Sequence, residues 1–461
     1  MAVYIHLFDT VAEYEETRAN NYVEPWVSYT EETSGLSFNK TEYEKLLETP
    51  LTFNIISAGT IVWKAVNTAY TTTIEYSTDN GSTWNTITST TGSSAPSISV
   101  DAGDKIQFRG DNATYSSGGT RYNSFSGSIA KFEVEGNIMS LIDNTGYTTA
   151  TTLQSVYTFN NLFGNCTGLT SAENLVLPAT TLANYCYTNM FNGCTSLRTA
   201  PSILPATTLA SYCCQYMFYG CTSLTTAPEL PATTLAENCY NSMFQRCTSL
   251  TTAPELPATS LANYCYNGMF QNCTGLTTAP ALPATTLATN CYSRMFEYCS
   301  SLTSAPVLPA TTLASSCYSS MFSDCTGLTT EPVLPATTLA NWCYMEMFWG
   351  CSSLTTAPEL PATTLAENCY QNMFGSCSSL TTAPELPATT LAKDCYSYMF
   401  DGCTSLNYIK CLATDISARN CTNGWVGGVA STGTFVKNNS MQDWTTGNNG
   451  IPSNWTVQDA S

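Results

Sequence analysis

Cysteine is the side chain with the greatest chemical potential in this sequence, because 22 thiols occur among 461 residues. All of them lie between Cys166 and Cys421, and most return at one fixed interval. No pair has the Cys-x-x-Cys spacing that zinc sites use, so a metal site is not indicated. A cysteine at one position of every repeat is best interpreted as a small buried apolar side chain, with regular disulfides as the alternative.

Other groups that perform acid–base or metal chemistry are scarce. His6 is the only histidine, which argues against Ser-His-Asp, Cys-His and His–zinc sites. Glu229 and Glu255 recur at one repeat position, and repetition explains them better than a glycosidase pair of carboxylates does. We therefore predict that the chain is not an enzyme, that it has no catalytic residues, and that it binds no cofactor or metal.

Composition narrows the class of protein further. Acidic residues outnumber basic ones by 34 to 15, for a formal net charge of −19, which disfavours nucleic-acid binding. The apolar share of 43% is enough for a real core. No stretch approaches the ~20 apolar residues of a membrane span. Residues 1–10 lack the basic start and apolar run of a signal peptide, so we expect neither membrane insertion nor signal-directed export.

The elements that position these side chains belong to a repeat. Successive units begin 26 residues apart, at Cys221, Cys247, Cys273, Cys299, Cys325, Cys351, Cys377 and Cys403. Two slightly longer units precede them, starting at Cys166 and Cys194. A fixed period of this length predicts a solenoid, in which each unit buries its apolar face against its neighbours.

The spacing within a unit predicts a short helix and a short strand. Apolar residues recur at every fourth position in two columns, Leu235, Cys239, Met243 and Cys247, and Ala236, Tyr240 and Phe244. This pattern predicts an amphipathic helix with Thr233 or Thr234 as its N-cap. Pro228 and Pro231 exclude helix from the other half, which is predicted as a very short strand running into an extended turn.

The repeat also carries a family resemblance. Met243-Phe244-x-x-Cys247-x-x-Leu250 and its counterparts resemble the 26-residue repeats of bacterial surface proteins, relatives of BspA-like leucine-rich repeats. The Leu-Pro-Ala-Thr-Thr-Leu-Ala segment and the paired cysteines depart from that pattern. The resemblance implies a curved leucine-rich-repeat-like solenoid used for attachment, and it implies no catalytic residue.

Four regions are predicted along the chain. They are an N-terminal anchoring segment at 1–47 with a helix-like stretch at 40–47, a β-sandwich domain at 48–140, the leucine-rich-repeat-like solenoid at 141–406, and a β-rich C-terminal cap at 407–461. Alternating Thr, Ile, Val, Tyr and Phe at 51–136 predict the antiparallel sandwich. The expected fold class is therefore α+β and multidomain. The cap covers the exposed core of the last coil, and a tip that also binds ligand is the alternative.

One octet in the predicted sandwich resembles a known motif. Ser77-Thr-Asp-Asn-Gly-Ser-Thr-Trp84 centres on Asn80-Gly81, which predicts a β-hairpin turn. The octet resembles the Asp-box of sialidases, where it is a structural hairpin and not the active site. The arginine cluster and acid/base pair of those enzymes are not recognisable here. The acidic loops at 101–104 and 110–112 are interpreted as turns, with calcium ligands as the alternative.

The order of the regions resembles that of modular appendage proteins of crAss-like phages, which infect Bacteroides. This resemblance implies an N-terminal anchor on other virion proteins, with Tyr22, Pro25 and Trp26 as anchoring candidates, and a distal solenoid that meets bacterial surface or mucin glycans. The expected function is a non-enzymatic virion structural protein, a head fibre or tail-associated fibre, assembled in the host cytoplasm. A homotrimer is a candidate assembly, and a bacterial cell-surface BspA-like adhesin is the alternative function.

Differences between the copies locate the candidate binding residues. Unvarying Leu, Cys, Met, Phe and Pro positions indicate packing, whereas varying positions face solvent. Exposed aromatic residues suit carbohydrate, because a sugar offers an apolar ring face and a rim of hydroxyls; an ordinary polar surface is the alternative. The candidates are Tyr212, Tyr219, Tyr264, Trp342 and Trp349. Trp342 and Trp349, seven apart on the predicted helix, would share a side and form the best contact patch.

Overall fold

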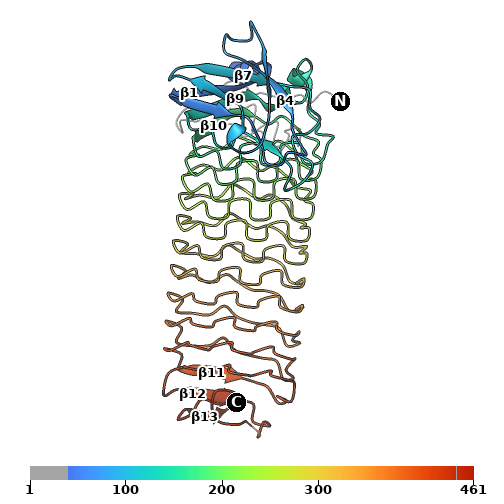
Figure 1. Ribbon diagram of the computed structural model, residues 1–461. Coiled ribbons are helices and arrows are strands. Elements are labelled where there is room, and N and C mark those ends of the chain that lie inside the picture. Colours follow the sequence, from blue (N-terminus) through green and yellow to red (C-terminus); the bar gives the residue numbers. More distant parts are fainter. Residues whose placement is uncertain (1–39, 443, 461) are drawn as a thin grey trace.

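The molecule is elongated, with a sheet-rich part at its N-terminal end and a long stack of coils beneath it (Figure 1). The computed structural model describes residues 40–442 and 444–460. Within that range α2 (Lys40–Glu48) is the one α-helix, and it confirms the helix predicted at 40–47. Three 3-10 helices accompany it, η2 (Gly92–Ser94), η3 (Ile138–Leu141) and η4 (Tyr147–Thr149). A membrane-spanning helix is not found over the same range.

A six-stranded sheet forms the N-terminal part, in the order β10-β9-β1-β7-β4-β5. Its strands are β1 (Leu51–Ser57), β4 (Thr73–Ser77), β5 (Asn85–Thr88), β7 (Lys105–Arg109), β9 (Lys131–Asn137) and β10 (Leu169–Val176). Two smaller sheets pair β2 (Gly59–Val62) with β6 (Ser97–Val100) and β3 (Lys64–Ala65) with β8 (Asn123–Ser124). Neighbours in the large sheet are antiparallel except β10, which runs parallel to β9. One large sheet and two small ones thus stand where a two-sheet sandwich was expected, and the large sheet continues into the first repeat.

Proline decides which copies of the repeat contain a regular strand. Where a copy has proline in this segment, as at Pro254, equivalent residues make only isolated parallel bridges, such as Thr252 with Thr278. The first copy has Glu173 at that position and forms the eight-residue strand β10. The last copy has Lys410 there and forms β11 (Tyr408–Cys411). The reason is that proline has no N–H to donate to a ladder.

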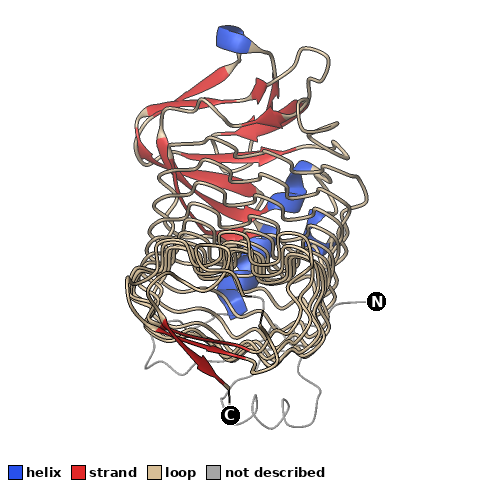
Figure 2. Ribbon diagram, turned by 90° about the horizontal axis from the view of Figure 1, so that it is seen from below, coloured by secondary structure: helices blue, strands red, loops and turns tan. Residues whose placement is uncertain are grey.

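Successive repeats stack as coils, with equivalent residues one above another. Parallel bridges join residues 26 positions apart, as between Ser260 and Thr286. Threonine hydroxyls reinforce this stacking, because Thr277 Oγ1 donates to the Thr251 carbonyl of the preceding coil at 3.3 Å. Viewed along the stack, the coils overlie one another with little displacement (Figure 2).

The helix predicted in each repeat is wrong, because the segment is a run of turns. The Cys239 and Met243 amides donate to the carbonyls three residues earlier, at 3.3 and 3.2 Å. The Tyr240 and Phe244 amides instead donate to Cys265 and Met269 carbonyls of the next coil, at 3.0 and 2.9 Å. Alternate amides therefore close turns and build a ladder between coils. A strict spacing of four drifts by about 40° per step on an α-helix, whereas consecutive four-residue turns keep it on one face.

The interior of the stack consists of columns of like side chains. Phenylalanine rings stack coil on coil from Phe163 to Phe400, with centroids 5.2–5.8 Å apart. A second column of buried tyrosine rings accompanies it. The phenylalanine column begins inside the N-terminal part, where Phe163 lies 6.1 Å from Phe53 and 5.8 Å from Phe125. The sheet and the coils therefore share one hydrophobic core.

The cysteines belong to this core. All 22 are buried and none is in a disulfide, which confirms their interpretation as packing residues. The Cys247 thiol donates a hydrogen bond to the Phe218 carbonyl of the preceding coil at 3.1 Å, and Cys273 does the same to Phe244 at 3.0 Å. Burial raises the pKa of the Cys273 thiol to about 12. These thiols therefore stay protonated and unreactive near neutral pH.

The C-terminal end of the core is covered by indole rings. A parallel sheet of β11, β12 (Thr434–Lys437) and β13 (Thr456–Asp459) closes the chain. Trp425 lies 6.2 Å from Tyr396 and 6.3 Å from Phe400, so it ends both aromatic columns. Trp444 stacks on Trp425 at 5.6 Å. These contacts are those that a capping segment needs.

Candidate functional site

The outward side of the turn runs is the surface on which the predicted binding residues lie. In the coil of Cys239 three residues have left-handed backbone, Asn238, Ser242 and Arg246, with φ of 55°, 52° and 65°. Equivalent residues of the other coils share this conformation. We call this surface the turn face, and its three sites the first, second and third left-handed positions. Glycine and asparagine adopt such a backbone most readily, and they occupy many of these positions.

Bulky aromatic residues occupy other left-handed positions. Tyr212, Tyr264 and Trp342 stand at the first position with φ of 59°, 57° and 57°. Tyr298 stands at the third position and Tyr398 at the second, with φ of 63° and 55°. This conformation costs a non-glycine residue about 1–2 kcal/mol. Tyr212 stacks on Tyr185, but the other four residues each leave more than a third of their surface exposed, and a strained, exposed residue is a candidate functional residue.

The exposed aromatic side chains of the described chain all lie on the turn face. They are Tyr264, Tyr298, Trp342, Trp349 and Tyr398, and each of them has 37–43% of its surface exposed. The sequence interpretation did not identify Tyr298 and Tyr398, because it followed only two of the varying positions. A four-residue period applied to the varying positions would have located both.

Trp342 and Trp349 do not share a helix side, because their coil contains a turn run. Trp342 occupies the first left-handed position, and Trp349 directly precedes the third, which is Gly350. Among the ring contacts of the described residues, none joins these two indoles. Trp349 extends over the next coil, where a Cβ on Gly375 would lie 2.7 Å from its Cδ1. The two tryptophans are thus separate candidate contact points on one face.

Tyr212 and Tyr219 belong to a different group, near the N-terminal end of the stack. Tyr212 stacks on Tyr185 at 4.6 Å, and Tyr185 stacks on Tyr157 at the same distance. Tyr219 meets the Arg246 guanidinium at 5.7 Å. Both predicted residues are half-buried in this group. The structure therefore does not bring them together with Trp342 and Trp349.

Hydrogen-bonding side chains lie among the exposed aromatics. Gln245, Gln271 and Glu297 form a hydrogen-bonded row across three coils, in which each glutamine Nε2 donates to the next residue. The pKa of Glu297 is raised, because burial raises it by more than the nearby Arg294 guanidinium lowers it. The carboxylate of Asp324 raises the pKa of Tyr298, whose hydroxyl donates a hydrogen bond to it.

The next coil continues this polar surface. Ser320 Oγ donates to Glu346 Oε2 at 3.0 Å. Asp324 and Glu346 both add negative charge near Glu297 and raise its pKa. The turn face around Trp342 is therefore acidic and rich in hydrogen-bond acceptors. Within the described residues, no group of histidine, cysteine or acidic side chains is arranged as a metal site.

The hairpin predicted at Asn80-Gly81 is confirmed, since β4 and β5 pair antiparallel on either side of it. Asn80 and Gly81 have φ of 58° and 82°. Ser77 Oγ donates a hydrogen bond to Asp79 Oδ1 at 2.8 Å and accepts one from the Gly81 amide at 2.9 Å. Hydrogen bonds from Thr83 and Ser77 lower the pKa of Asp79 to about 2. The polar side chains of the octet therefore stabilise the hairpin turn itself.

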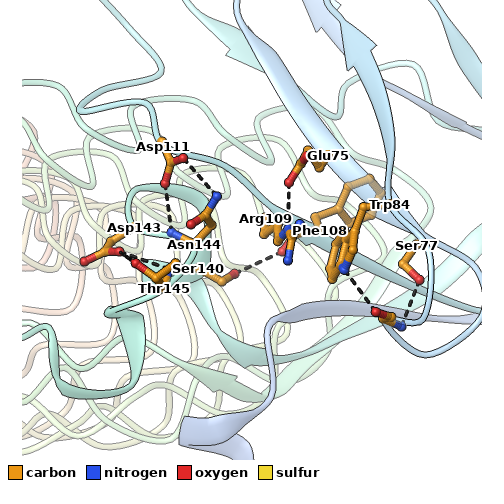
Figure 3. Close-up of polar contacts among 11 residues, drawn as sticks. Glu75, Ser77, Trp84, Phe108, Arg109, Asp111, Ser140, Asp143, Asn144 and Thr145 are labelled. Atoms are coloured by element: carbon orange, nitrogen blue, oxygen red, sulfur yellow. Dashed lines mark hydrogen bonds and ion pairs between the residues drawn. The ribbon is translucent and has the colours of Figure 1, made fainter.

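The polar groups around this hairpin satisfy one another. Figure 3 shows Arg109 between Glu75 and Trp84. Arg109 Nε lies 2.7 Å from Glu75 Oε2, and its guanidinium lies 4.0 Å from the Trp84 ring. In the predicted turn at 110–112, Asp111 Oδ1 accepts the Asn144 amide at 3.0 Å. In the turn at 101–104, Asp104 Oδ2 accepts the Asp101 amide at 2.8 Å. These carboxylates hold loops in place.

The predicted virion-anchoring residues Tyr22, Pro25 and Trp26 lie outside the described residues.

Comparison with known proteins identifies the repeat. The family model described as the BspA type leucine rich repeat region matches residues 142–266, 206–329 and 315–421, with 6 copies. These matches together span more than half of the chain. No curated protein and no solved structure matches the chain.

Proposed function

The chain belongs to the BspA-type leucine-rich repeat family, whose repeats point to a surface or adhesin-type protein, and from this premise we propose that it is a non-enzymatic attachment protein. The coil stack acts as a spacer, and the turn face contacts the target. One observation carries the proposal: the exposed aromatic side chains gather on this face, four of the five at left-handed positions that are costly for a bulky residue, and each leaves 37–43% of its surface open to solvent.

Glycans of bacterial surfaces or mucin are the proposed target. Ring faces of Trp342 and Trp349 suit the apolar face of a sugar, and the neighbouring carboxylates and hydroxyls suit its rim. Binding of the full-length chain to bacterial cells and to mucin tests the proposal. The informative variant is Trp342→Asn with Trp349→Ser, because Asn368 and Ser323 occupy the equivalent sites of neighbouring coils.

We expect this double variant to bind about tenfold more weakly, since each stacked aromatic contributes about 0.5–1.5 kcal/mol. Val307→Glu with Val333→Glu is the matched control. These valines are 71% and 72% exposed but lie outside the turn face, in the column where other coils have glutamate, such as Glu255. Undiminished binding by the tryptophan variant, or equal loss in the control, would contradict a role for the turn face.

We further propose that the protein acts in a phage virion, as a head fibre or tail-associated fibre docked through its N-terminal part. Two observations support this placement: the order of sheet region and repeats resembles that of phage appendage proteins, and 22 buried, unpaired thiols suit assembly in a reducing cytoplasm. A bacterial cell-surface adhesin is the second candidate, and the family itself favours it. Detection of the chain in purified phage particles by mass spectrometry, or on intact bacterial cells, separates the two.

A further inference from the structure

In the C-terminal half of the stack, coils with exposed aromatic side chains alternate with coils whose equivalent residues are small and polar. Tyr298 belongs to the coil of Cys291, Trp342 and Trp349 to that of Cys343, and Tyr398 to that of Cys395. These coils are two apart along the stack, in its orange and red part (Figure 1). The coil of Cys317 lies between the first two, and there Ser316 and Asp324 are half-buried whereas Ser320 and Ser323 are buried. The coil of Cys369 lies between the last two, and there Ser376 is exposed and Asn372 half-buried, whereas Asn368 and Gly375 are buried.

The interval between aromatic coils has the length of a sugar repeat. Equivalent phenylalanine rings of successive coils in this part lie 5.6–5.8 Å apart. Two coils therefore advance by about the length of one disaccharide unit in an extended polysaccharide. An extended chain along the stack would place a ring on each aromatic coil, and its hydroxyls would reach Ser316, Asp324 and Ser376 of the coils between.

Glycines in the neighbouring coils give the aromatic rings room to lie over them. A Cβ on Gly375 would meet Trp349 Cδ1 at 2.7 Å and Nε1 at 3.2 Å. Gly375 does not have a left-handed backbone, so its own conformation does not require glycine. A Cβ on Gly424 would similarly meet Tyr398 Cε1 at 2.5 Å. The rings of Trp349 and Tyr398 thus extend along the stack, in the direction of the proposed ligand.

The charge of this surface selects among glycans. Asp324 and Glu346 lie close enough to Glu297 for their negative charges to raise the pKa of its carboxyl group. The cations nearby are paired, Arg294 with Glu297 at 4.0 Å and Lys393 with Glu367. Carboxylates accept hydrogen bonds from sugar hydroxyls but repel uronate, sialate and sulfate groups. The surface therefore favours an uncharged glycan.

We propose that an extended, neutral polysaccharide binds lengthwise on the turn face from Tyr298 to Tyr398, with Trp349 as its central stacking platform. This proposal rests on the proposed attachment function and names its ligand class. It commits to a glycan because the spacing of the coils, the orientation of the rings and the acceptor-rich charge all suit a sugar chain.

The test measures binding of the full-length chain to neutral cello-, xylo- and manno-oligosaccharides of increasing length, and to heparin and polygalacturonate. At least one neutral series should bind with affinity that rises until the ligand spans the three aromatic coils. The anionic polymers should bind more weakly than the neutral series. Affinity that does not change with length, or preference for the anionic polymers, would overturn the proposal.

Gly375→Ala is the decisive variant, because it displaces the Trp349 ring without removing it. We expect roughly two- to tenfold weaker binding of the longest neutral ligand, the effect of one lost aromatic stack. Gly119→Ala is the control, since a Cβ there meets no atom within 4 Å. Trp349→Ser gives a second variant with a residue that the neighbouring coil has at Ser323. Wild-type affinity in both turn-face variants would contradict the proposal.

The two proposals fail in different ways. A chain that binds bacterial cells through Trp342 and Trp349 but binds none of the neutral oligosaccharides refutes the ligand class and retains the attachment function. Capture of a cell-surface protein in place of a glycan has the same meaning. A chain that binds neither cells nor oligosaccharides refutes both.

Discussion

At the scale of single residues, the turn face is a series of sites where backbone and side chain have different requirements. The backbone favours glycine or asparagine at each left-handed position, as found at Asn290, Asn368 and Gly350. Trp342, Tyr264 and similar residues are present at the same sites against that preference. Their side chains are partly exposed, which is why we propose that they contact a ligand.

This conflict makes a prediction about stability. Trp342→Asn should leave the free energy of unfolding unchanged or raise it by up to about 1–2 kcal/mol, because the left-handed conformation no longer bears a bulky residue. The reciprocal change, Asn290→Trp at the equivalent position of another coil, should lower it by a similar amount. Urea denaturation of both variants measures the difference. A clear loss of stability in Trp342→Asn would mean that the indole packs as part of the fold.

A second prediction at this scale concerns Asp79. Its folded pKa of about 2 is below the ordinary value of 3.8, so the hairpin stabilises the ionised carboxylate. This stabilisation is complete above the ordinary value and is lost as the pH falls through about 2. An NMR titration of the side-chain carboxyl should give that low midpoint, and Thr83→Ala should move it upward. A wild-type midpoint at the ordinary value would contradict the hydrogen bonds that Asp79 accepts from Ser77 and Thr83.

At the scale of the element, the unit of structure is the turn run together with its partner in the next coil. In a run such as 236–247, some amides donate to carbonyls of the same run and the others donate to the next coil. A single run therefore cannot satisfy all of its amides by itself. The phenylalanine and tyrosine columns have the same dependence, because each ring stacks on its neighbours above and below. Stability should therefore be transmitted from coil to coil.

Phe270→Ala tests that transmission. Phe270 is fully buried and stacks on Phe244 at 5.6 Å and on Phe296 at 5.8 Å. We expect a loss of about 3–5 kcal/mol from the cavity. The interrupted column should also divide thermal unfolding into two transitions, measured by calorimetry. Thr274→Ala, at an exposed site of the next coil, should leave a single transition. One unshifted transition in Phe270→Ala would contradict coupling through the column.

At the scale of the whole molecule, one core runs from the N-terminal sheet to the cap. Strand β10 joins the first coil to the sheet, and Trp425 ends both aromatic columns at the other end. The thiols lie inside this core, so their redox state records the compartment in which the chain folded.

Thiol titration is the corresponding prediction. The native protein should react very slowly with a thiol reagent at neutral pH, because burial raises the thiol pKa values, as for Cys247 and Cys273. After denaturation, 22 thiols should titrate if the chain assembles in a reducing cytoplasm. A much smaller number after denaturation would indicate disulfides and would favour the exported adhesin over the virion protein. Denatured protein whose thiols have been alkylated should show no reaction and serves as the negative control.

Much of the fold was predictable from local chemistry. Burial of the repeat cysteines followed from their constant position, and the hairpin at Asn80-Gly81 followed from its turn residues. The proline positions also predicted where a strand could not continue, which β10 and β11 bear out by lacking that proline. The exposed aromatics of the turn face were predictable in part, since Trp342, Trp349 and Tyr264 were identified from the sequence, whereas Tyr298 and Tyr398 were not.

The sequence by itself determined the period, the identity of the core columns and the sites of turns, because these depend on residue type at a given position. Tertiary structure decided the backbone of the apolar run. An apolar residue at every fourth position suits both a helix and consecutive turns, and only hydrogen bonds from Tyr240 and Phe244 to the next coil distinguish them. Because that choice sets which side chains point outward, the alignment of aromatics from several coils along one face is a property of the stacked molecule.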